Sequence, residues 1–216
     1  MVQSSNARSK RAEARRLEIL RAAARVFRRD GFAGAGMREI AAEADLSPGN
    51  LYHYFRGKHE ILYFCQDRAL ETMLAALQQA RLSRAPSDDK LAAVIHAHVR
   101  CLLDELQGSV AHLEVEALPD ELRAAIIRKR DRYERGIRRL VAAGVRDGQF
   151  VACDTRLVTR AILGAVNWTA RWFRLEGPRT PSAVADTLAD YLVRGLAAAP
   201  QRRGERRRVA RSGGEA

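Results

Sequence analysis

Hydrophobic residues recur every three or four positions between residues 37 and 64, and the pair Ser47-Pro48 interrupts this pattern. The spacing places the apolar side chains of each part on one face of a helix. Ser47 supplies a capping hydroxyl, and a proline at the first position of a helix loses no hydrogen bond. Leu51 and Phe55, four residues apart, face inward in the second helix. The segment is therefore predicted to form two short helices joined by a tight turn, followed at once by a third.

This layout is typical of a helix-turn-helix DNA reader, whose second helix enters the DNA groove. Gly49 lets that helix approach the base edges closely, and Asn50 and His53 are the best candidates for hydrogen bonds there. Lys58, at the first turn of the next helix, is expected to hold a phosphate. The predicted DNA-contacting residues are Arg38, Ser47, Pro48, Gly49, Asn50, Tyr52, His53, Tyr54 and Lys58. Tyr52 and Tyr54 are expected to reach phosphates, and burial in the three-helix core is the alternative for each.

Gly31-Phe32 closes a first helix, and the run MREIAAEADLSPGNLYHYFRGKHEIL follows shortly after it. Together these residues resemble the DNA-binding module of the TetR (tetracycline repressor) family over about the first third of the chain. One departure is Ala35-Gly36, where the family usually has Thr or Ser before the second helix. The resemblance implies an all-α protein that binds a palindromic operator as a homodimer and is released from it by a small molecule.

The rest of the chain continues the helical pattern. Predicted helices cover residues 58–81 and 87–108, a short stretch from Ser109, and residues 120–147. Two more begin at Asp154 or Thr155 and at Thr180-Pro181. We therefore expect an all-α fold with a helix-turn-helix domain at 11–57 and a ligand-binding and dimerisation domain at 58–199. A basic flexible arm at 1–10 and a basic tail at 200–216 are expected to flank these domains.

The last two helices carry apolar stripes with small residues that permit close backbone approach. Such a pair can associate with its copy in a second subunit to form a four-helix interface, as in TetR-family dimers. The residues expected at this interface are Leu157, Ala161, Gly164, Ala165, Leu188, Tyr191 and Leu192.

Residues 119–196 resemble the TetR subgroup that governs fatty-acid and steroid-ring breakdown and responds to acyl-CoA thioesters. An acyl chain needs an apolar tunnel, and the CoA phosphates and adenine need basic groups and a stacking surface near its mouth. The residues expected to provide these are Asn167, Trp168, Arg171, Trp172, Phe173 and Arg174. The alternative is that the tryptophans belong to the dimer interface and the arginines are solvated.

The 38 Lys and Arg residues exceed the 26 Asp and Glu residues, which gives a net charge of +12. This excess is consistent with a polyanionic partner. The basic cluster at the front, which includes Arg11, Arg15 and Arg16, is expected to reach the minor groove or adjacent phosphates. An architectural protein that binds nucleic acid through its basic tails without sequence preference is the alternative.

Other functions have little support in the sequence. It contains no Gly-rich phosphate loop, no G-x-S-x-G and no HExxH motif, so no enzyme activity and no cofactor are expected. A regulator that senses a different small apolar ligand or a metal is a further alternative. For a metal, His96 and His98 point to different sides of a helix, and His112 with Glu114 and Glu116 would have to converge from a neighbouring helix to complete the site. No apolar stretch is long enough to span a membrane and no signal peptide is evident, so a cytoplasmic location is expected.

Overall fold

The structure is a computed structural model that describes residues 2–103, 114–174 and 176–198, with only the backbone described for residues 2–10. Within these ranges the secondary structure is α-helical, apart from an isolated bridge between Phe150 and Ala197. The all-α prediction is confirmed. The predicted basic tail lies outside the described residues, as do residues 109–113 of the helix predicted from Ser109. Residues 114–118, which were expected to complete that helix, are described and are not helical. The helices are α1 (Val2–Gly34), α2 (Met37–Glu43), α3 (Pro48–Tyr54), α4 (Lys58–Leu82), α5 (Ser87–Leu103), α7 (Asp120–Arg146), α8 (Thr155–Trp172) and α9 (Pro181–Arg194).

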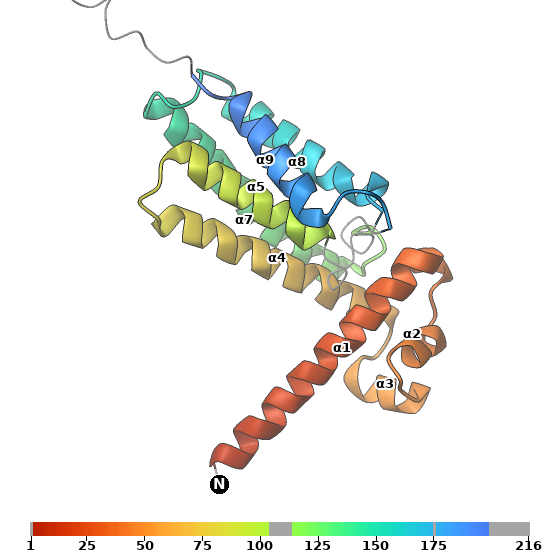
Figure 1. The fold of residues 1–216 in the computed structure, drawn as a ribbon. Coiled ribbons are helices and arrows are strands. Elements are labelled where there is room, and N and C mark those ends of the chain that lie inside the picture. The colour runs from red at the N-terminus through yellow and green to blue at the C-terminus, as the bar shows by residue number, and fades with distance from the viewer. Residues whose placement is uncertain (1, 104–113, 175, 199–216) are drawn as a thin grey trace, which may run out of the picture.

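The helices α1, α2 and α3 form the N-terminal part of the molecule, which we call the reader (Figure 1). Its core contains Phe27, Ile40, Leu51 and Phe55, each at most 1% exposed. The inward positions predicted for Leu51 and Phe55 are therefore confirmed. The helix α1 begins at Val2, within the segment that was expected to be a flexible arm, and its N-terminal half extends beyond α2 and α3. The backbone departs from helical geometry at Gly31, where φ is 70°.

Local capping rules account for where several helices start. The Ser47 hydroxyl accepts a hydrogen bond of 3.2 Å from the backbone N–H of Asn50 and so caps α3. Asp154 accepts from two backbone N–H groups at the start of α8, and Thr180 accepts from Ala183 at the start of α9. Gly36 precedes α2 without a side-chain cap, as the departure at this position implied. The turn signals in the sequence thus set the boundaries of these helices.

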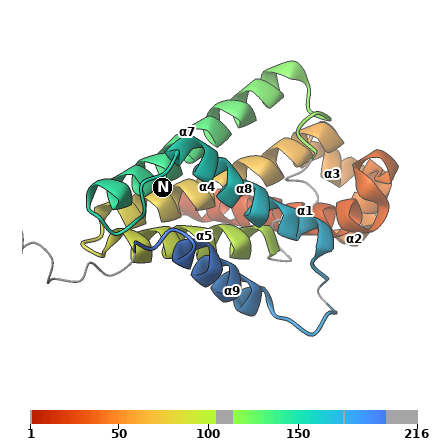
Figure 2. The same ribbon diagram turned by 90° about the horizontal axis from the view of Figure 1, so that it is seen from above.

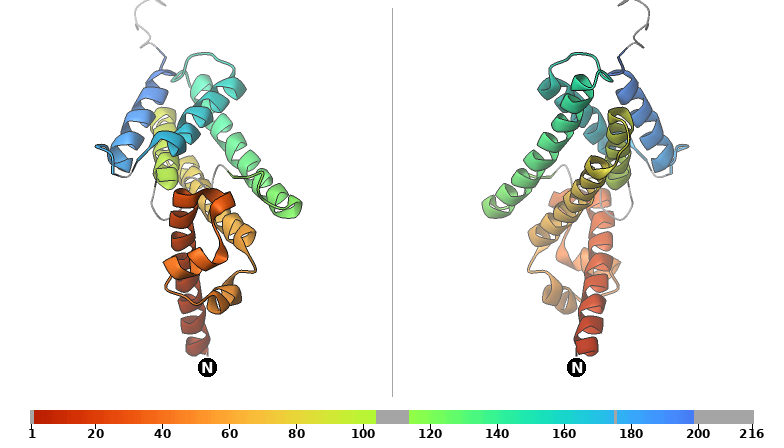
Figure 3. Two further views of the ribbon diagram at one scale, coloured as in Figure 1. Left: turned by 90° about the vertical axis from the view of Figure 1, so that its right-hand side faces the viewer. Right: turned by 90° about the vertical axis from the view of Figure 1, so that its left-hand side faces the viewer.

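The remaining helices form the body of the molecule. The helices α8 and α9 both pack on α5, whereas α7 packs on α4, α5 and α8. Seen from above, α9 and the N-terminal end of α7 lie on opposite sides of the body (Figure 2). The side views show the reader at one end of the body, with α4 running from one part into the other (Figure 3). No helix in the described part of the chain is both long and apolar enough to cross a membrane.

An ion-pair cluster joins α7 to α4. The Lys129 ammonium lies 2.6 Å from an Asp67 carboxylate oxygen and also contacts the Glu71 carboxylate. Burial by itself lowers the pKa of Lys129, but the hydrogen bonds to Asp67 and Glu71 outweigh it and the net shift is upward. Lys129 therefore stays charged and holds α7 against the helix that continues into the reader.

Candidate functional site

The outer surface of α3 carries most of the residues that were predicted to contact DNA. Leu51 is fully buried, whereas Gly49, Asn50 and His53 are exposed and Tyr52 is 54% exposed. These four residues share the solvent-facing side of a short helix that is capped and packed from behind. The arrangement leaves an amide, an imidazole and a phenol free to reach a groove.

The other predicted contacts surround this helix. Pro48 and Ser47 are exposed at its N-terminus, although the Ser47 hydroxyl is already engaged as the cap. Arg38 is exposed in the first turn of α2. Tyr54 is half-buried and packs against the reader core, as the alternative of burial implied in part, and its contact with a phosphate stays a prediction.

Lys58 has a different position from the one expected. Its ammonium donates to the backbone carbonyls of Phe32, Ala33 and Ala35 at 3.0, 3.1 and 3.0 Å. It also lies 4.9 Å from the centre of the Phe32 ring. An ammonium has three N–H donors, and all three are used here. We therefore correct the prediction that Lys58 holds a DNA phosphate, because its charge is directed at the end of α1.

Two arginines of the predicted basic front cluster also donate hydrogen bonds to backbone carbonyls of the protein. Arg15 donates to the Ala44 carbonyl at 3.1 Å, and Arg16 donates to the Tyr54 carbonyl at 3.3 Å. These carbonyls lie at the ends of α2 and α3. Arg15 and Arg16 therefore contact backbone carbonyls within the reader, which corrects the expectation that they reach the DNA.

The residues predicted to bind the effector do not form one site. Trp168 is 64% exposed and Trp172 is 47% exposed on the outer side of α8. Arg171 is exposed as well, and Arg174 donates to backbone carbonyls of its own chain segment. The Oδ1 atom of Asn167 is buried, whereas the next side chain, Trp168, faces outward. Successive positions of a helix point about 100° apart, so these two neighbours lie on different sides of α8. The prediction that the tryptophans line an effector tunnel is wrong for this arrangement.

Phe173, the remaining residue of that predicted set, is partly buried. It packs against the hydrophobic core of the body, and its ring lies edge-on to the Trp172 ring at 6.5 Å. It therefore anchors the end of α8 and is not placed beside the two exposed arginines in a common cavity.

A buried polar cluster inside the body was not identified from the sequence. His98 of α5 and Tyr133 of α7 are each 3% exposed, and their rings meet edge-on at 5.3 Å. Gln66 of α4 is 1% exposed, and the Oδ1 atom of Asn167 is also buried. His98 contacts Tyr133 and is hydrogen-bonded to Asn167, and we call these three residues the interior polar cluster. A signal was present in the sequence, because His98 falls on the apolar stripe of its helix, four residues after Val94.

The environment of this cluster sets its protonation states. Burial lowers the pKa of His98 to about 4, a hydrogen bond with Asn167 partly opposes this, and the charge of Arg130 adds to the lowering. Burial also raises the pKa of Tyr133. Both groups are therefore neutral near pH 7, with the phenol kept as a hydrogen-bond donor.

His96 and His98 do not converge on a metal site. The Nε2 atom of His96 lies 3.1 Å from Asp186, whereas His98 lies in the interior. Among the described residues, no three His, Cys, Asp or Glu side chains are grouped to hold a metal ion. His112 lies outside the described residues.

The predicted dimer residues lie on an exposed face formed by α8 and α9. Leu157 is 65% exposed and Tyr191 is 73% exposed. Tyr191 lines an open groove of about 650 Å³ between the two helices. Ala161, Leu192 and Leu196 line that groove. Gly164 and Ala165 are exposed on α8, and Leu188 is half-buried on α9. Together with the exposed Trp168 and Trp172, we call these residues the α8–α9 face.

Two family comparisons agree with this architecture. Residues 19–63 match the family described as "Bacterial regulatory proteins, tetR family". Residues 84–196 match "Tetracyclin repressor-like, C-terminal domain". The chain belongs to the TetR family. The family assignment includes DNA binding and transcription regulation, which the exposed helix-turn-helix supports.

Similarity to individual TetR-family proteins extends over most of the chain. The crystal structure of PfmR from Thermus thermophilus is 34% identical, with a TM-score of 0.75 over 82% of this chain and 98% of that one. The fatty acid metabolism regulator protein of Bacillus subtilis is 24% identical over 83% of this chain and 94% of its own. AibR, solved with isovaleryl coenzyme A and operator DNA, shares the fold at 24% identity, with a TM-score of 0.68 over 84% of this chain and 97% of that one.

The position of Lys58 leads to a stability prediction. Lys58→Met removes three hydrogen bonds from carbonyls at the end of α1, so the free energy of unfolding should fall by about 1–3 kcal/mol. Urea denaturation followed by circular dichroism measures this change. The dependence of DNA affinity on salt should stay the same in the folded variant, because no phosphate contact is lost.

Arg38→Met is the matched control, since Arg38 is exposed and its loss should leave stability unchanged. A stable Lys58→Met protein with a reduced salt dependence would contradict this role.

His98 should make the stability depend on pH. Its pKa is about 4 in the folded protein and near 6.5 when unfolded, so the unfolded state takes up the proton first on acidification. The free energy of unfolding should be highest above pH 6.5 and fall between pH 6.5 and 4, by about 3 kcal/mol at most from this group. Urea denaturation at a series of pH values should show that His98→Gln loses this part of the dependence. The exposed His53→Gln control should retain it, and equal profiles for all three proteins would refute the assignment.

Proposed function

We propose that the protein is a ligand-controlled repressor that binds a palindromic operator as a homodimer and is released from it by an acyl-CoA thioester. The observation that carries this proposal is the connection between the exposed α3 and the interior polar cluster. The single helix α4 begins just after α3 and packs on α5 and α7, which carry His98 and Tyr133 of the cluster. A ligand inside the body is thus linked to the reader by one rigid element.

DNA recognition is assigned to the outer surface of α3. Asn50 can pair with the major-groove edge of adenine and His53 can hydrogen-bond to a neighbouring base. Tyr52, Tyr54 and Arg38 lie at the borders of this surface and are assigned to phosphates. Gly49 has no atom within 4 Å of the position where a Cβ would lie, so its surface is open for close approach.

A second copy of the chain is the proposed occupant of the α8–α9 face. Large apolar side chains are rarely exposed together on a surface that stays uncovered. Two copies related by a two-fold axis would cover each other's tryptophans and bring two α3 helices to one side of the assembly. Successive half-sites of a palindrome lie about 34–36 Å apart, or a multiple of that distance.

The interior polar cluster is the proposed recognition site for the effector. The Tyr133 hydroxyl is buried and has no hydrogen bond to any described residue, and it remains protonated. Such a donor would suit the carbonyl oxygen of a thioester in otherwise apolar surroundings. The names of the similar proteins support the same ligand class, because one is a regulator of fatty acid metabolism and another was solved with an acyl-CoA.

Fluorescence anisotropy tests this function. The labelled probe is DNA from the gene's own upstream region, titrated with protein at fixed near-physiological salt, alone and with acyl-CoA thioesters or their free acids. We expect tight, sequence-specific binding that one thioester reverses and its free acid does not. Tyr133→Phe should bind the DNA normally but require about tenfold more thioester, the effect of about one hydrogen bond. Specific binding that no thioester disturbs would reject the acyl-CoA assignment, and binding without sequence preference would reject the regulator.

The dimer makes a separate prediction. Trp168→Glu or Tyr191→Glu places a charge in the α8–α9 face, so the dimer dissociation constant should rise at least thirtyfold, roughly the weight of one central aromatic anchor. Sedimentation equilibrium measures this constant. Leu82→Glu is the control, because Leu82 is 75% exposed at the end of α4, away from the face. A monomeric native protein, or dimers equally stable in all variants, would contradict the proposed interface.

A further inference from the structure

Each of the three reader helices receives a cation from another element at its C-terminal end. Lys58 donates to the carbonyls at the end of α1, and Arg15 donates to Ala44 and Asp45 just beyond α2. Arg16 donates to Tyr54, the last residue of α3. The C-terminus of a helix has unpaired carbonyls and a partial negative charge, so a cation there satisfies both. Of these three contacts, that of Arg16 bears directly on the helix assigned to base recognition.

Arg16 makes more than one contact at this place. Its Nη2 atom lies 3.3 Å from the Tyr54 carbonyl oxygen. Its guanidinium carbon lies 5.1 Å from the centre of the Phe55 ring and 4.8 Å from that of Phe64. The two rings meet edge-on with their centres 5.7 Å apart. A planar guanidinium can stack on aromatic rings and still donate at its edge, which an ammonium cannot do in the same way.

These contacts join three separate helices at one point. Arg16 belongs to α1, the Tyr54 carbonyl ends α3, and Phe64 lies in α4. Phe55 is only 1% exposed, so its ring has a fixed position against which the guanidinium rests. The orientation of α3 relative to α1 and α4 therefore depends on this side chain.

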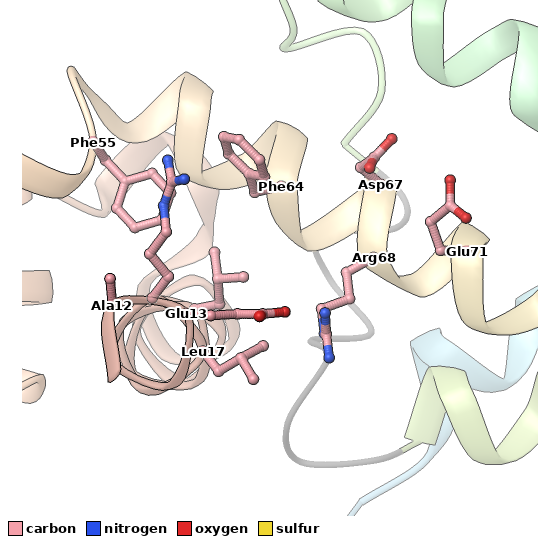
Figure 4. A pocket seen from close by; sticks show the side chains of 10 residues that line it. Ala12, Glu13, Leu17, Phe55, Phe64, Asp67, Arg68 and Glu71 are labelled. Atoms are coloured by element: carbon pink, nitrogen blue, oxygen red, sulfur yellow. The ribbon is translucent and has the colours of Figure 1, made fainter. Parts of the chain in front are cut away.

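The space between α1 and α4 is open next to Arg16. A groove of about 460 Å³ separates the two helices, and Arg16, Phe55 and Phe64 form part of its wall. Figure 4 shows Glu13 and Leu17 of α1 on one side of this groove and Arg68 of α4 on the other. The Arg16 contacts with Phe55 and Phe64 therefore lie at the wall of this open groove.

We propose that Arg16 is a positioning residue for DNA recognition, which fixes the orientation of α3 through Tyr54, Phe55 and Phe64 and does not contact DNA itself. The proposal rests on the proposed function in one respect, namely that α3 reads the operator. It predicts that Arg16 affects the discrimination between DNA sequences. A phosphate contact would instead support binding to every sequence equally.

Salt dependence and specificity separate these two roles. The probes are a labelled duplex selected by the native protein from randomised DNA and an unrelated duplex of equal length, each titrated at several salt concentrations. Arg16→Met should weaken binding to the selected duplex at least about tenfold, comparable to losing one base contact. Its affinity for the unrelated duplex and its salt slope should not change. Arg16→Lys keeps the charge but not the planar group, so it should restore only part of the affinity.

Arg11→Met is the matched control, because Arg11 is an exposed arginine of the same helix with no ion pair to any described residue. It removes the same charge and should leave the ratio of the two affinities unchanged. The proposal is overturned if Arg16→Met weakens both duplexes equally and lowers the salt slope by about one, as for a lost phosphate contact. It is also overturned if Arg16→Met binds both duplexes like the native protein.

A measurement without DNA keeps the proposal separate from the proposed function. Hydrogen exchange of the backbone amides in residues 51–57 should accelerate in Arg16→Met, while exchange in α5 should stay as in the native protein. Acceleration throughout the chain would indicate general unfolding and reject a positioning role, as would unchanged exchange in α3. If the native protein showed no sequence preference, the proposed function would fail, whereas this exchange result would still report on Arg16.

Discussion

The helix α4 is shared by the reader and the body, and the way it is held at two places determines how the two parts sit together. At its first residue, the Lys58 ammonium is bound to the last carbonyls of α1. Further along, Asp67 and Glu71 hold Lys129 of α7. Since α4 is one continuous helix of 25 residues, a shift of α7 would reach the reader as a rigid-body movement. This is a physical route by which a ligand in the body would change the spacing of two α3 helices in a dimer.

The positive charge of the protein is used within the fold as well as for a partner. Arg15, Arg16 and Lys58 lie on helix C-termini, and Arg25 forms an ion pair with Glu43 at the end of α2. These cations hold short helices in place that would be unstable alone, since helices of seven residues are far below the length at which isolated helices form. The net charge of +12 is therefore not a measure of how many cations are available to a polyanionic partner.

Features set by neighbouring residues could be predicted from the sequence, and features set by distant ones could not. The starts of α3, α8 and α9 follow from Ser47, Asp154 and Thr180, because a cap and its helix lie within three residues of each other. The inward and outward sides of α3 follow from helical spacing. The roles of Arg16 and Lys58 depend on carbonyls more than twenty residues away, and periodicity carries no information about such contacts. The two tryptophans illustrate the same limit, because spacing placed them on one side of α8 but did not say whether that side faces a cavity or solvent.

The most direct test of the account measures how DNA and effector influence each other. Isothermal titration calorimetry would give the dissociation constant of the active thioester for the protein alone and for the protein saturated with its selected operator duplex. Linkage requires that the operator weaken thioester binding by the same factor by which the thioester weakens operator binding, typically about 5–150-fold. We predict equal factors within this range. A thioester affinity that the operator leaves unchanged would contradict coupling through α4 and with it the proposed mechanism.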